Sequence, residues 1–307
     1  MKRIVSLLPS ATEIICALGL REALFGRSHE CDFPPDVQQL PALTAPRFAL
    51  DGSSRQLDQR VKTVLESARS VYRVDVERLR QLRPDTIVTQ TQCEVCAVDL
   101  DELQRVMQEW DAGARPALIA LEAASLEGVF ADIERVAQAL EVAERGIQVV
   151  AGLHNRIDTV AQRAQQAVRQ PTLAFIEWLD PPMAGGNWIP ELVARAGARD
   201  LFVRPGEPSP WIDLAQLQAA DPDLILIAPC GFNLERSWAE LGQIMSQPGW
   251  AQLRAVRQGA VTVADGNQYF NRPGPRLVES LEIIAEIAHP ELFDFGHQGR
   301  GWRRWSG

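Results

Sequence analysis

Lysine is almost missing from this sequence. Lys2 and Lys62 stand against 29 arginines, so reactions that need a lysine have few candidates. The chain also lacks a glycine-rich loop that ends in Gly-Lys-Ser or Gly-Lys-Thr, a Gly-x-Gly-x-x-Gly after a strand, and a Gly-x-Ser-x-Gly turn. These absences exclude the common signatures of nucleotide-binding proteins and serine hydrolases.

Positive charge and long apolar runs are scarce as well. The formal net charge is −9 at pH 7, which argues against a nucleic-acid partner because phosphates require clustered positive charge. No stretch of the sequence reaches the roughly 18 apolar residues that a membrane span requires. Residues 299–307 are basic, and we expect them to form a frayed end of the chain.

The N-terminal residues and the cysteine count indicate in which cellular compartment the protein is expected. Residues 1–8 begin like an export signal, but Pro9 and Glu13 interrupt the apolar stretch, so we interpret them as part of the folded domain. Five cysteines, an odd number, do not indicate a disulfide framework. Both observations predict a cytoplasmic protein, with a periplasmic location as the alternative if the true start lies upstream.

Short apolar runs alternate with helical patterns along the chain, which predicts parallel β-α-β units. The expected strands lie at residues 4–8, 23–26, 86–89, 117–121, 172–177, 224–228 and 260–263. Between the two groups of strands the pattern is helical, and its phase slips near Glu141, so we expect two helices, the second at residues 143–169.

The predicted fold class is therefore α/β, with two lobes joined by one long backbone helix. Each lobe is expected to have a central, mostly parallel sheet flanked by helices. The predicted domains are an N-terminal lobe at residues 1–124, a helical linker at 125–170 and a C-terminal lobe at 171–307.

Local motifs add detail to this plan. Residues 10–13 have the pattern of a capping box, which predicts the start of a helix that Gly19 ends. Pro84-Asp85 and Pro222-Asp223 each stand between a helix and an apolar strand, as if both lobes shared one plan.

Loops rich in ligand-type side chains follow several of the expected strands. Ligands bind at the carboxyl ends of strands in open α/β sheets, so these loops predict a cleft that both lobes line. The candidate ligand-binding residues are His29, Glu30, Cys31, Gln90, Gln92, Cys93, Cys96, Trp178, Asn187, Trp188, Phe232, Tyr269, Phe270 and Arg272. Among the aromatic residues, we expect Trp188, Tyr269 and Phe270 to be the most exposed to the cleft.

The histidine and cysteines of these loops allow three interpretations. His29, Cys31, Cys93 and Cys96 contain the ligand types of a tetrahedral zinc site, and Cys93 and Cys96 could form a redox pair. They could instead contact an organic ligand. They could also be small buried side chains beside a hydrogen-bonded histidine.

The motifs together resemble a known family. Residues 4–13, Asp32-Phe33-Pro34-Pro35, the paired Pro-Asp segments and residues 272–276 resemble the substrate-binding proteins of cobalamin and iron-siderophore ABC transporters, especially the cobalamin branch. The resemblance covers nearly the whole chain. It implies two α/β lobes joined by one helix, a ligand between them, and an ABC transporter permease as a partner.

From this resemblance we expect non-catalytic binding of a cobalamin-like corrinoid. The aromatic residues suit a broad, partly apolar ring, and Gln90 and Gln92 suit its amide groups. His29 could approach the cobalt atom through a ring nitrogen. The alternatives are a haem or ferric-siderophore binding protein, and a metal- or thiol-dependent enzyme that uses His29, Cys93 and Cys96.

Overall fold

The computed structural model describes residues 2–66, 70–91, 100–108, 110 and 115–306. The chain divides into two compact units. Unit 1 contains Met1–Gly52, Gln56–Ala123 and Glu127–Ala151, and unit 2 contains Ser53–Arg55, Ala124–Leu126 and Gly152–Gly307. The division between Ala151 and Gly152 falls inside one helix, α6 (Ala143–Ala164), so this helix carries the chain from one unit to the other.

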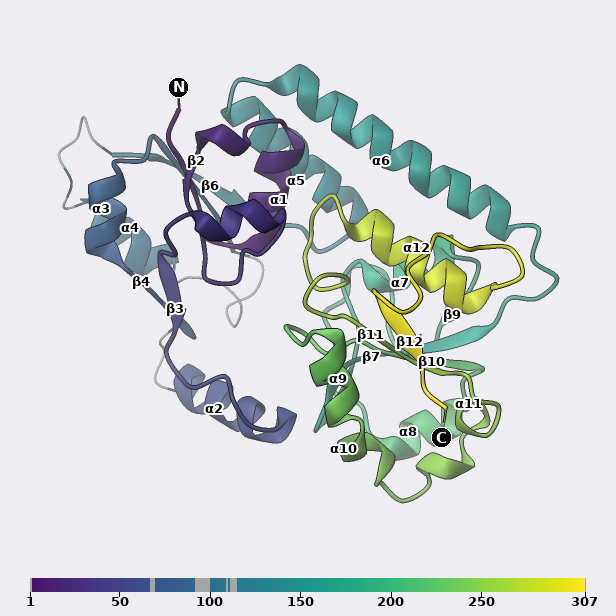
Figure 1. Cartoon of the computed structure of the whole chain (residues 1–307). Coiled ribbons are helices and arrows are strands. Elements are labelled where there is room, and N and C mark those ends of the chain that lie inside the picture. Colours follow the sequence, from purple (N-terminus) through teal and green to yellow (C-terminus); the bar gives the residue numbers. More distant parts are fainter. Residues whose placement is uncertain (1, 67–69, 92–99, 109, 111–114, 307) are drawn as a thin grey trace. The chain divides into compact units, whose positions relative to one another are not determined.

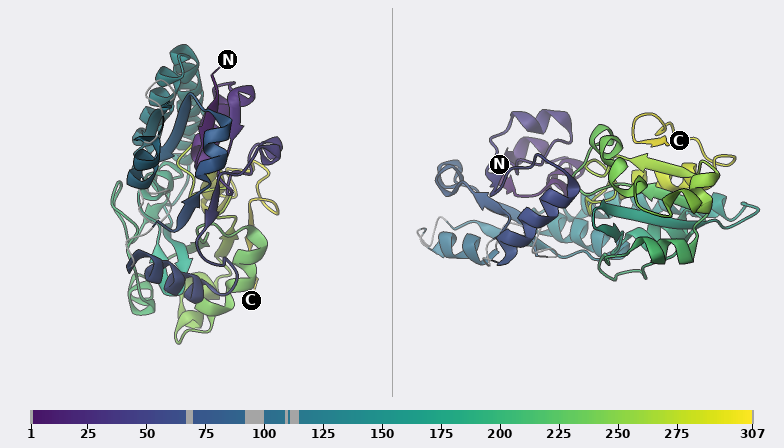
Figure 2. Two further views of the ribbon diagram at one scale, coloured as in Figure 1. Left: turned by 90° about the vertical axis from the view of Figure 1, so that its left-hand side faces the viewer. Right: turned by 90° about the horizontal axis from the view of Figure 1, so that it is seen from below.

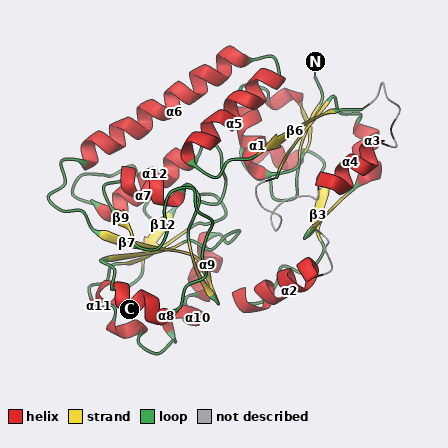
Figure 3. Cartoon of the chain, turned by 180° about the vertical axis from the view of Figure 1, so that it is seen from behind, coloured by secondary structure: helices red, strands yellow, loops and turns green. Residues whose placement is uncertain are grey.

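Unit 1 is built on a four-stranded parallel sheet in the order β2-β1-β5-β6. Helices α1 and α5 cover one face and α3 and α4 the other (Figures 1 and 3). Its sheet strands are β1 (Ile4–Ser6), β2 (Leu24–Gly26), β5 (Thr86–Gln90) and β6 (Ala117–Leu121). Its helices are α1 (Pro9–Ala17), α2 (Ser54–Glu66), α3 (Val76–Leu82), α4 (Leu100–Gln108) and α5 (Leu126–Ala139).

A separate antiparallel pair completes unit 1. It consists of β3 (Thr44–Pro46) and β4 (Tyr72–Val74), and Thr44 lies opposite Val74 while Pro46 lies opposite Tyr72. The sequence did not predict this pair.

The start of α1 differs from the sequence prediction. The helix begins at Pro9, and its N-cap residue Leu8 makes no side-chain cap, so the predicted capping box is wrong. Proline at the first helical position is preorganised for a helix and needs no N–H partner there. Gly19 follows the helix with φ +72°, as predicted for its end.

Unit 2 is built on a larger sheet in the order β12-β11-β10-β7-β8, with β9 also paired to β7. Pairs β7–β9, β7–β10 and β10–β11 are parallel, whereas β8 and β12 are antiparallel additions. The strands are β7 (Thr172–Leu179), β8 (Pro182–Ala184), β9 (Arg199–Asp200), β10 (Leu224–Ile227), β11 (Val261–Ala264) and β12 (Trp302–Arg304). The helices are α7 (Ile189–Arg195), α8 (Leu214–Ala220), α9 (Leu234–Glu240), α10 (Gly242–Met245), α11 (Arg254–Arg257) and α12 (Leu277–Ala288).

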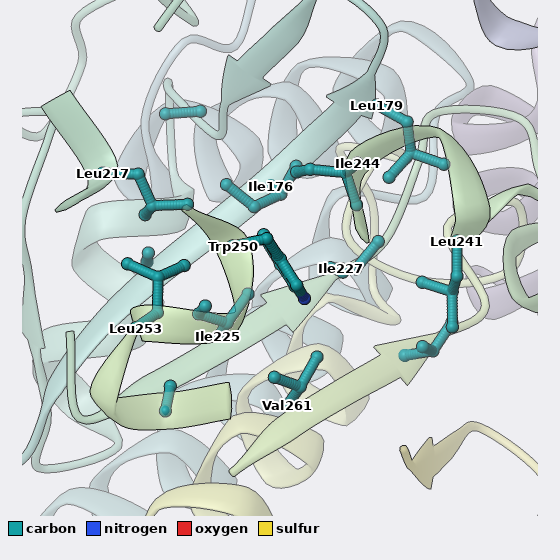
Figure 4. Packing of buried hydrophobic residues seen from close by; sticks show 14 of the residues in the cluster. Ile176, Leu179, Leu217, Ile225, Ile227, Leu241, Ile244, Trp250, Leu253 and Val261 are labelled. Atoms are coloured by element: carbon teal, nitrogen blue, oxygen red, sulfur yellow. The ribbon is translucent and has the colours of Figure 1, made fainter. Parts of the chain in front are cut away.

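The helices of unit 2 lie in two layers, with α7 and α12 on one face of the sheet and α8, α10 and α11 on the other (Figure 1). The second face holds a cluster of buried side chains around Trp250, which includes Ile176, Leu179 and Ile225 (Figure 4). The predicted α/β fold, with mostly parallel sheets in two lobes and one long connecting helix, is confirmed. Among the helices that the structure describes, none combines the length and apolar character of a membrane span.

The C-terminal residues are ordered into this sheet. Strand β12, yellow in Figures 1 and 2, runs antiparallel to β11. Trp302 is buried, and its Nε1 donates a hydrogen bond of 2.6 Å to Glu286 Oε2. The predicted frayed end is therefore wrong, because burial of an indole outweighs the fraying that an arginine-rich tail suggested.

The paired Pro-Asp segments have matching roles. Helices α3 and α8 both end in a left-handed residue, Arg83 with φ 46° and Asp221 with φ 39°. Asp85 then accepts a hydrogen bond of 2.7 Å from the N–H of Arg3, just before β1, and Asp223 accepts one of 2.8 Å from the N–H of Thr172, the first residue of β7. Each aspartate thus ties the start of its strand to the first strand of the unit.

Candidate ligand-binding site

Both units present loops at the carboxyl ends of their parallel strands. In unit 1, residues 27–31 follow β2, and Gln90 is the last residue of β5. In unit 2, the β7–β8 turn and residues 228–232 after β10 occupy the corresponding edge. Ligands bind at this edge of open α/β sheets, so these loops are the candidate site of each unit.

His29 is fixed by hydrogen bonds to the β3–β4 pair. Its backbone N–H and its Nδ1 lie 3.0 Å and 2.7 Å from Thr44 Oγ1. That hydroxyl also lies 2.9 Å from Ser28 Oγ, so Thr44 Oγ1 bridges the imidazole and the Ser28 hydroxyl.

The surroundings of His29 keep the ring neutral. Burial and then the positive charge of Arg27 lower the pKa of His29 from 6.5 to about 4. The Tyr72 ring stands edge-on to the imidazole with the ring centres 4.9 Å apart, and its hydroxyl donates to Glu30 Oε1 at 2.7 Å. The result is a neutral, oriented imidazole, and its buried Nε2 atom has no hydrogen-bond partner among the residues that the structure describes.

Cys31 lies apart from this arrangement although it is close in sequence. It is 1% exposed, and its sulfur accepts a hydrogen bond of 3.0 Å from Thr12 Oγ1 in the core of unit 1. Gln90 is also buried. Gln92, Cys93 and Cys96 lie outside the described residues, so the zinc and redox interpretations find no support from them. Within the described ranges, no three His, Cys, Asp or Glu side chains gather as a metal site would require.

A β-bulge near the end of β7 changes the sheet face to which Trp178 points. Ile176 lies opposite Ala184 and Trp178 opposite Met183, so Glu177 is one extra residue on β7. Met183 in turn lies opposite Trp211 in an isolated antiparallel bridge. Directly opposite residues of antiparallel strands share one face, so Trp178, Met183 and Trp211 stand side by side. We call these three residues the apolar ladder.

The apolar ladder lies on the sheet face away from the cluster around Trp250. Each ladder residue is adjacent in sequence to a member of that cluster, namely Leu179, Ala184 or Ile212. Since successive strand residues point to opposite faces, the ladder projects from the other face, the one that α7 and α12 cover elsewhere. Trp211 is 51% exposed, and Trp178 and Met183 are half-buried, so part of the ladder remains open to a ligand.

The inner end of the ladder is stiffened by further rings. Trp178 packs against Phe232 with ring centres 5.2 Å apart, and the Arg236 guanidinium lies 3.8 Å from the centre of the Phe232 ring. Phe232 itself is buried. The Nε1 atom of Trp178 is buried and has no hydrogen-bond partner in the described part of the chain, which leaves one indole N–H directed at no protein acceptor there.

Two of the proposed ligand contacts belong to the core instead. Trp188 is 6% exposed and Phe270 is 0% exposed, so the expected exposure of both rings is wrong. Trp188 Nε1 donates a 2.7 Å hydrogen bond to the backbone oxygen of Phe270, and the Phe270 ring packs on Phe175. The polar and glycine residues nearby in sequence form the turns, while the rings themselves fill the interior.

The other candidates of unit 2 have mixed surroundings. Tyr269 is half-buried, with the Arg276 guanidinium 4.9 Å from its ring centre. Arg272 is buried, and its Nη2 donates to Asn267 Oδ1 at 3.1 Å. Asn187 is half-buried and holds a left-handed backbone with φ 55°, stabilised by a hydrogen bond from the N–H of Gly206 to its carbonyl.

The sequence analysis missed four residues that shape these sites. Thr44 and Tyr72 hold His29 and Glu30, and Met183 and Trp211 extend the platform that begins at Trp178. Trp211 had a usable signal, because an indole between Pro210 and Ile212 in a turn-rich stretch is a candidate surface ring. Thr44 and Tyr72 had none, because their contacts join strands 28 residues apart in sequence to the loop after β2.

Comparisons with known proteins agree on the family. A model of the family described as periplasmic binding protein matches residues 4–267. The vitamin B12-binding protein of Vibrio cholerae is 23% identical over 302 residues, which cover 92% of this chain and 88% of that protein. The uncharacterized ABC transporter substrate-binding lipoprotein YvrC of Bacillus subtilis is 22% identical, with 95% and 81% covered.

Solved structures with similar folds include binders of two tetrapyrroles. The periplasmic vitamin B12 binding protein BtuF of Vibrio cholerae superposes with a TM-score of 0.68 at 20% identity, covering 94% of this chain and 97% of that chain. A periplasmic heme binding protein from Pseudomonas aeruginosa gives a TM-score of 0.73 at 22% identity, covering 100% and 98%. At these identities the likeness establishes the fold, and the ligand has to be argued from this chain's own residues.

The expected cytoplasmic location is wrong. The matched family and BtuF are described as periplasmic, and YvrC as a lipoprotein, which points to a location outside the cytoplasm. The odd cysteine count misled the prediction. Cys31 is buried beside Thr12, and burial shields a thiol from oxidation in any compartment.

Proposed function

Because this chain belongs to the periplasmic binding protein family, we propose that it binds a corrinoid of the cobalamin class and presents it to an ABC transporter permease without chemical turnover. The resemblance that the sequence motifs carried is confirmed at the level of the family. Relatives named vitamin B12-binding protein support the corrinoid, and the name of YvrC supports the transporter partner.

The apolar ladder is the observation that carries this proposal. A corrin ring is broad and largely apolar on its faces, so it requires a wide flat surface rather than a narrow pocket. Trp178, Met183 and Trp211 provide such a surface at the ligand-binding edge of the sheet.

The arginines of the same loops favour corrin over haem. Haem carries two carboxylates, which proteins usually bind with available guanidinium or ammonium groups. Arg276 instead donates to Gln268 Oε1 at 2.7 Å and to Glu279 Oε2 at 3.2 Å, and Arg272 donates to Asn267. The positive charge of Arg276 is already paired with Glu279 within the protein, which suits the neutral rim of a corrinoid better than the carboxylates of haem.

Calorimetric titration with cyanocobalamin tests the ladder. Trp211→Ala should weaken binding by about 10- to 100-fold, because a large aromatic contact at a binding surface is worth roughly 1.4–2.8 kcal/mol. Trp238→Ala is the matched control, since Trp238 is also exposed, at 37%, but lies on α9 outside the ladder. Both variants should keep the wild-type melting temperature.

Equal affinity of Trp211→Ala and Trp238→Ala would contradict the role of the ladder. Absence of binding by the wild-type protein, together with tight binding of haemin, would replace the corrinoid by haem as the ligand.

A further inference from the structure

A carboxylate stands beside the apolar ladder on the same face of the sheet. Ile176 and Leu179 both belong to the cluster around Trp250, which lies on the opposite face. Because of the β-bulge, the two residues between them, Glu177 and Trp178, both project to the ladder face. Glu177 therefore lies directly next to the ladder within unit 2, and its side chain is half-buried, so a ligand can reach it.

Ser209 holds this carboxylate at the ladder. Its hydroxyl donates a hydrogen bond of 3.1 Å to Glu177 Oε2 and accepts one of 3.0 Å from the N–H of Gly186. The stretch that contains Ser209 pairs with β8 through the bridge between Trp211 and Met183. Ser209 and Trp211 are two residues apart along this stretch, so both side chains point to the ladder face.

Close packing of the backbone fixes the position of Ser209. A Cβ atom on Gly186 would lie 2.4 Å from the backbone nitrogen of Ser209 and 2.6 Å from the carbonyl oxygen of Glu207, so a larger residue does not fit there. The N–H of Asn187 also donates to that carbonyl oxygen at 2.6 Å. The Glu177 carboxylate is thus supported by a well-packed turn, which is the support that a binding residue needs to keep one position.

The charge of this carboxylate distinguishes between two kinds of ligand group. An ionised carboxylate has about four acceptor positions and no donor, and the Ser209 hydroxyl occupies one of these positions. A ligand amide N–H beside it gains a charge-assisted hydrogen bond. A ligand carboxylate in the same place meets a like charge, which opposes binding.

We infer that Glu177 is a specificity-determining residue, which accepts a hydrogen bond from a rim amide of the bound corrinoid and excludes corrinoids that carry a carboxylate at that position. This inference rests on the proposed function and extends it to the choice among corrinoids. The apolar ladder contacts the face of the ring, which amide and carboxylate derivatives share. Glu177 stands at the border of the ladder, where the rim groups of a ring that lies on the ladder are expected.

Calorimetric titration with cyanocobalamin and its monocarboxylic acids tests the inference. Each acid has one rim amide hydrolysed to a carboxylate, and the separate isomers place this carboxylate at different positions of the rim. At neutral pH, the wild-type protein should bind at least one isomer about 10- to 100-fold more weakly than cyanocobalamin, because of the like charge of Glu177. For that isomer, Glu177→Gln should reduce the difference to less than about threefold, because a neutral amide can donate to the ligand carboxylate.

Matched variants separate this effect from a change in net charge. Glu235→Gln removes the same charge from unit 2, at an exposed residue on α9 that lies outside the ladder and pairs with Arg303. It should keep the wild-type preference for cyanocobalamin. Ser209→Ala should give an intermediate preference, because the carboxylate loses its support. Glu177→Gln and Glu235→Gln should both keep the wild-type melting temperature.

The outcomes distinguish this inference from the proposed function. Cyanocobalamin binding with the same discrimination in wild type and Glu177→Gln would overturn the role of Glu177 and leave corrinoid binding intact. Equal affinity of the wild type for cyanocobalamin and for every acid would do the same, as would an equal loss of discrimination in Glu235→Gln. Failure of every corrinoid to bind the wild-type protein would overturn both the inference and the proposed function.

Discussion

The two units share one strand plan but build different chemistry on it. Strands β2-β1-β5-β6 of unit 1 correspond in order and direction to β9-β7-β10-β11 of unit 2. Asp85 and Asp223 occupy equivalent positions and make the same hydrogen bond to the start of the first strand. The two units therefore share their strand order and direction, but this shared pairing does not determine what either unit binds.

The additions to the plan make the difference. Unit 2 adds the antiparallel strand β8, and the bulge in β7 opposite it turns Trp178 to the face where Met183 and Trp211 stand. Unit 1 adds the β3–β4 pair, from which Thr44 and Tyr72 hold His29. One unit thus presents an apolar surface and the other holds a neutral imidazole in one orientation, each through a short antiparallel element.

Removal of the Trp188 ring should have the largest effect on stability. Trp188 is buried in unit 2 and hydrogen-bonded to Phe270, so Trp188→Ala should lower the free energy of unfolding by about 3–5 kcal/mol. Trp211→Ala should change it by less than about 0.5 kcal/mol, because the ring is half exposed. Denaturant unfolding of both variants measures the contrast, and similar losses would show that the ladder is part of the core.

Asp223 should contribute more to the free energy of unfolding than Asp85. Asp223 accepts from the Thr172 N–H and Oγ1 and from Arg254, whereas the described bond of Asp85 is to the Arg3 N–H. We expect Asp223→Ala to cost about 2 kcal/mol and Asp85→Ala about 1 kcal/mol in the free energy of unfolding. Equal losses of unfolding free energy in urea would show that the two aspartates contribute equally to stability.

The stabilisation that the Asp223 carboxylate provides should be lost gradually in acid. Burial raises the pKa of Asp223, but the hydrogen bonds from Thr172 and the charge of Arg254 outweigh it, so the pKa lies below the ordinary 3.8. The stabilisation is therefore complete well above pH 3.8 and is lost as pH falls through the lower folded-state pKa. Below that pH, wild type and Asp223→Ala should approach the same stability. A constant difference between them down to strong acid would contradict the stabilising role of the ionised carboxylate.

Regular features of the fold were predictable because they follow periodicity. Most of the parallel strands appear near their expected residues, since buried apolar runs leave strong patterns, whereas the two-residue strand β9 was not predicted. Helix α6 ends at Ala164, short of the expected 169, because no proline or glycine marks its end in the sequence. Helix α2 and strand β12 were missed, because a polar surface helix and a three-residue edge strand leave weak patterns.

The site was less predictable because side-chain direction decides it. Glycine and asparagine before Trp188 suggested exposure, yet the turn they make points the indole inward. The bulge that exposes Trp178 breaks the alternation that sequence patterns rely on. His29 was recognised as a ligand type, but its orientation depends on Thr44, whose proximity only the folded chain shows.

Competition between two tetrapyrroles tests the central claim most directly. The purified protein is mixed with equal excesses of hydroxocobalamin and haemin, passed through a desalting column, and read by its visible spectrum. The account predicts retention of the corrin bands at one equivalent per chain. Retention of the haem Soret band, with no corrin absorption, would contradict it.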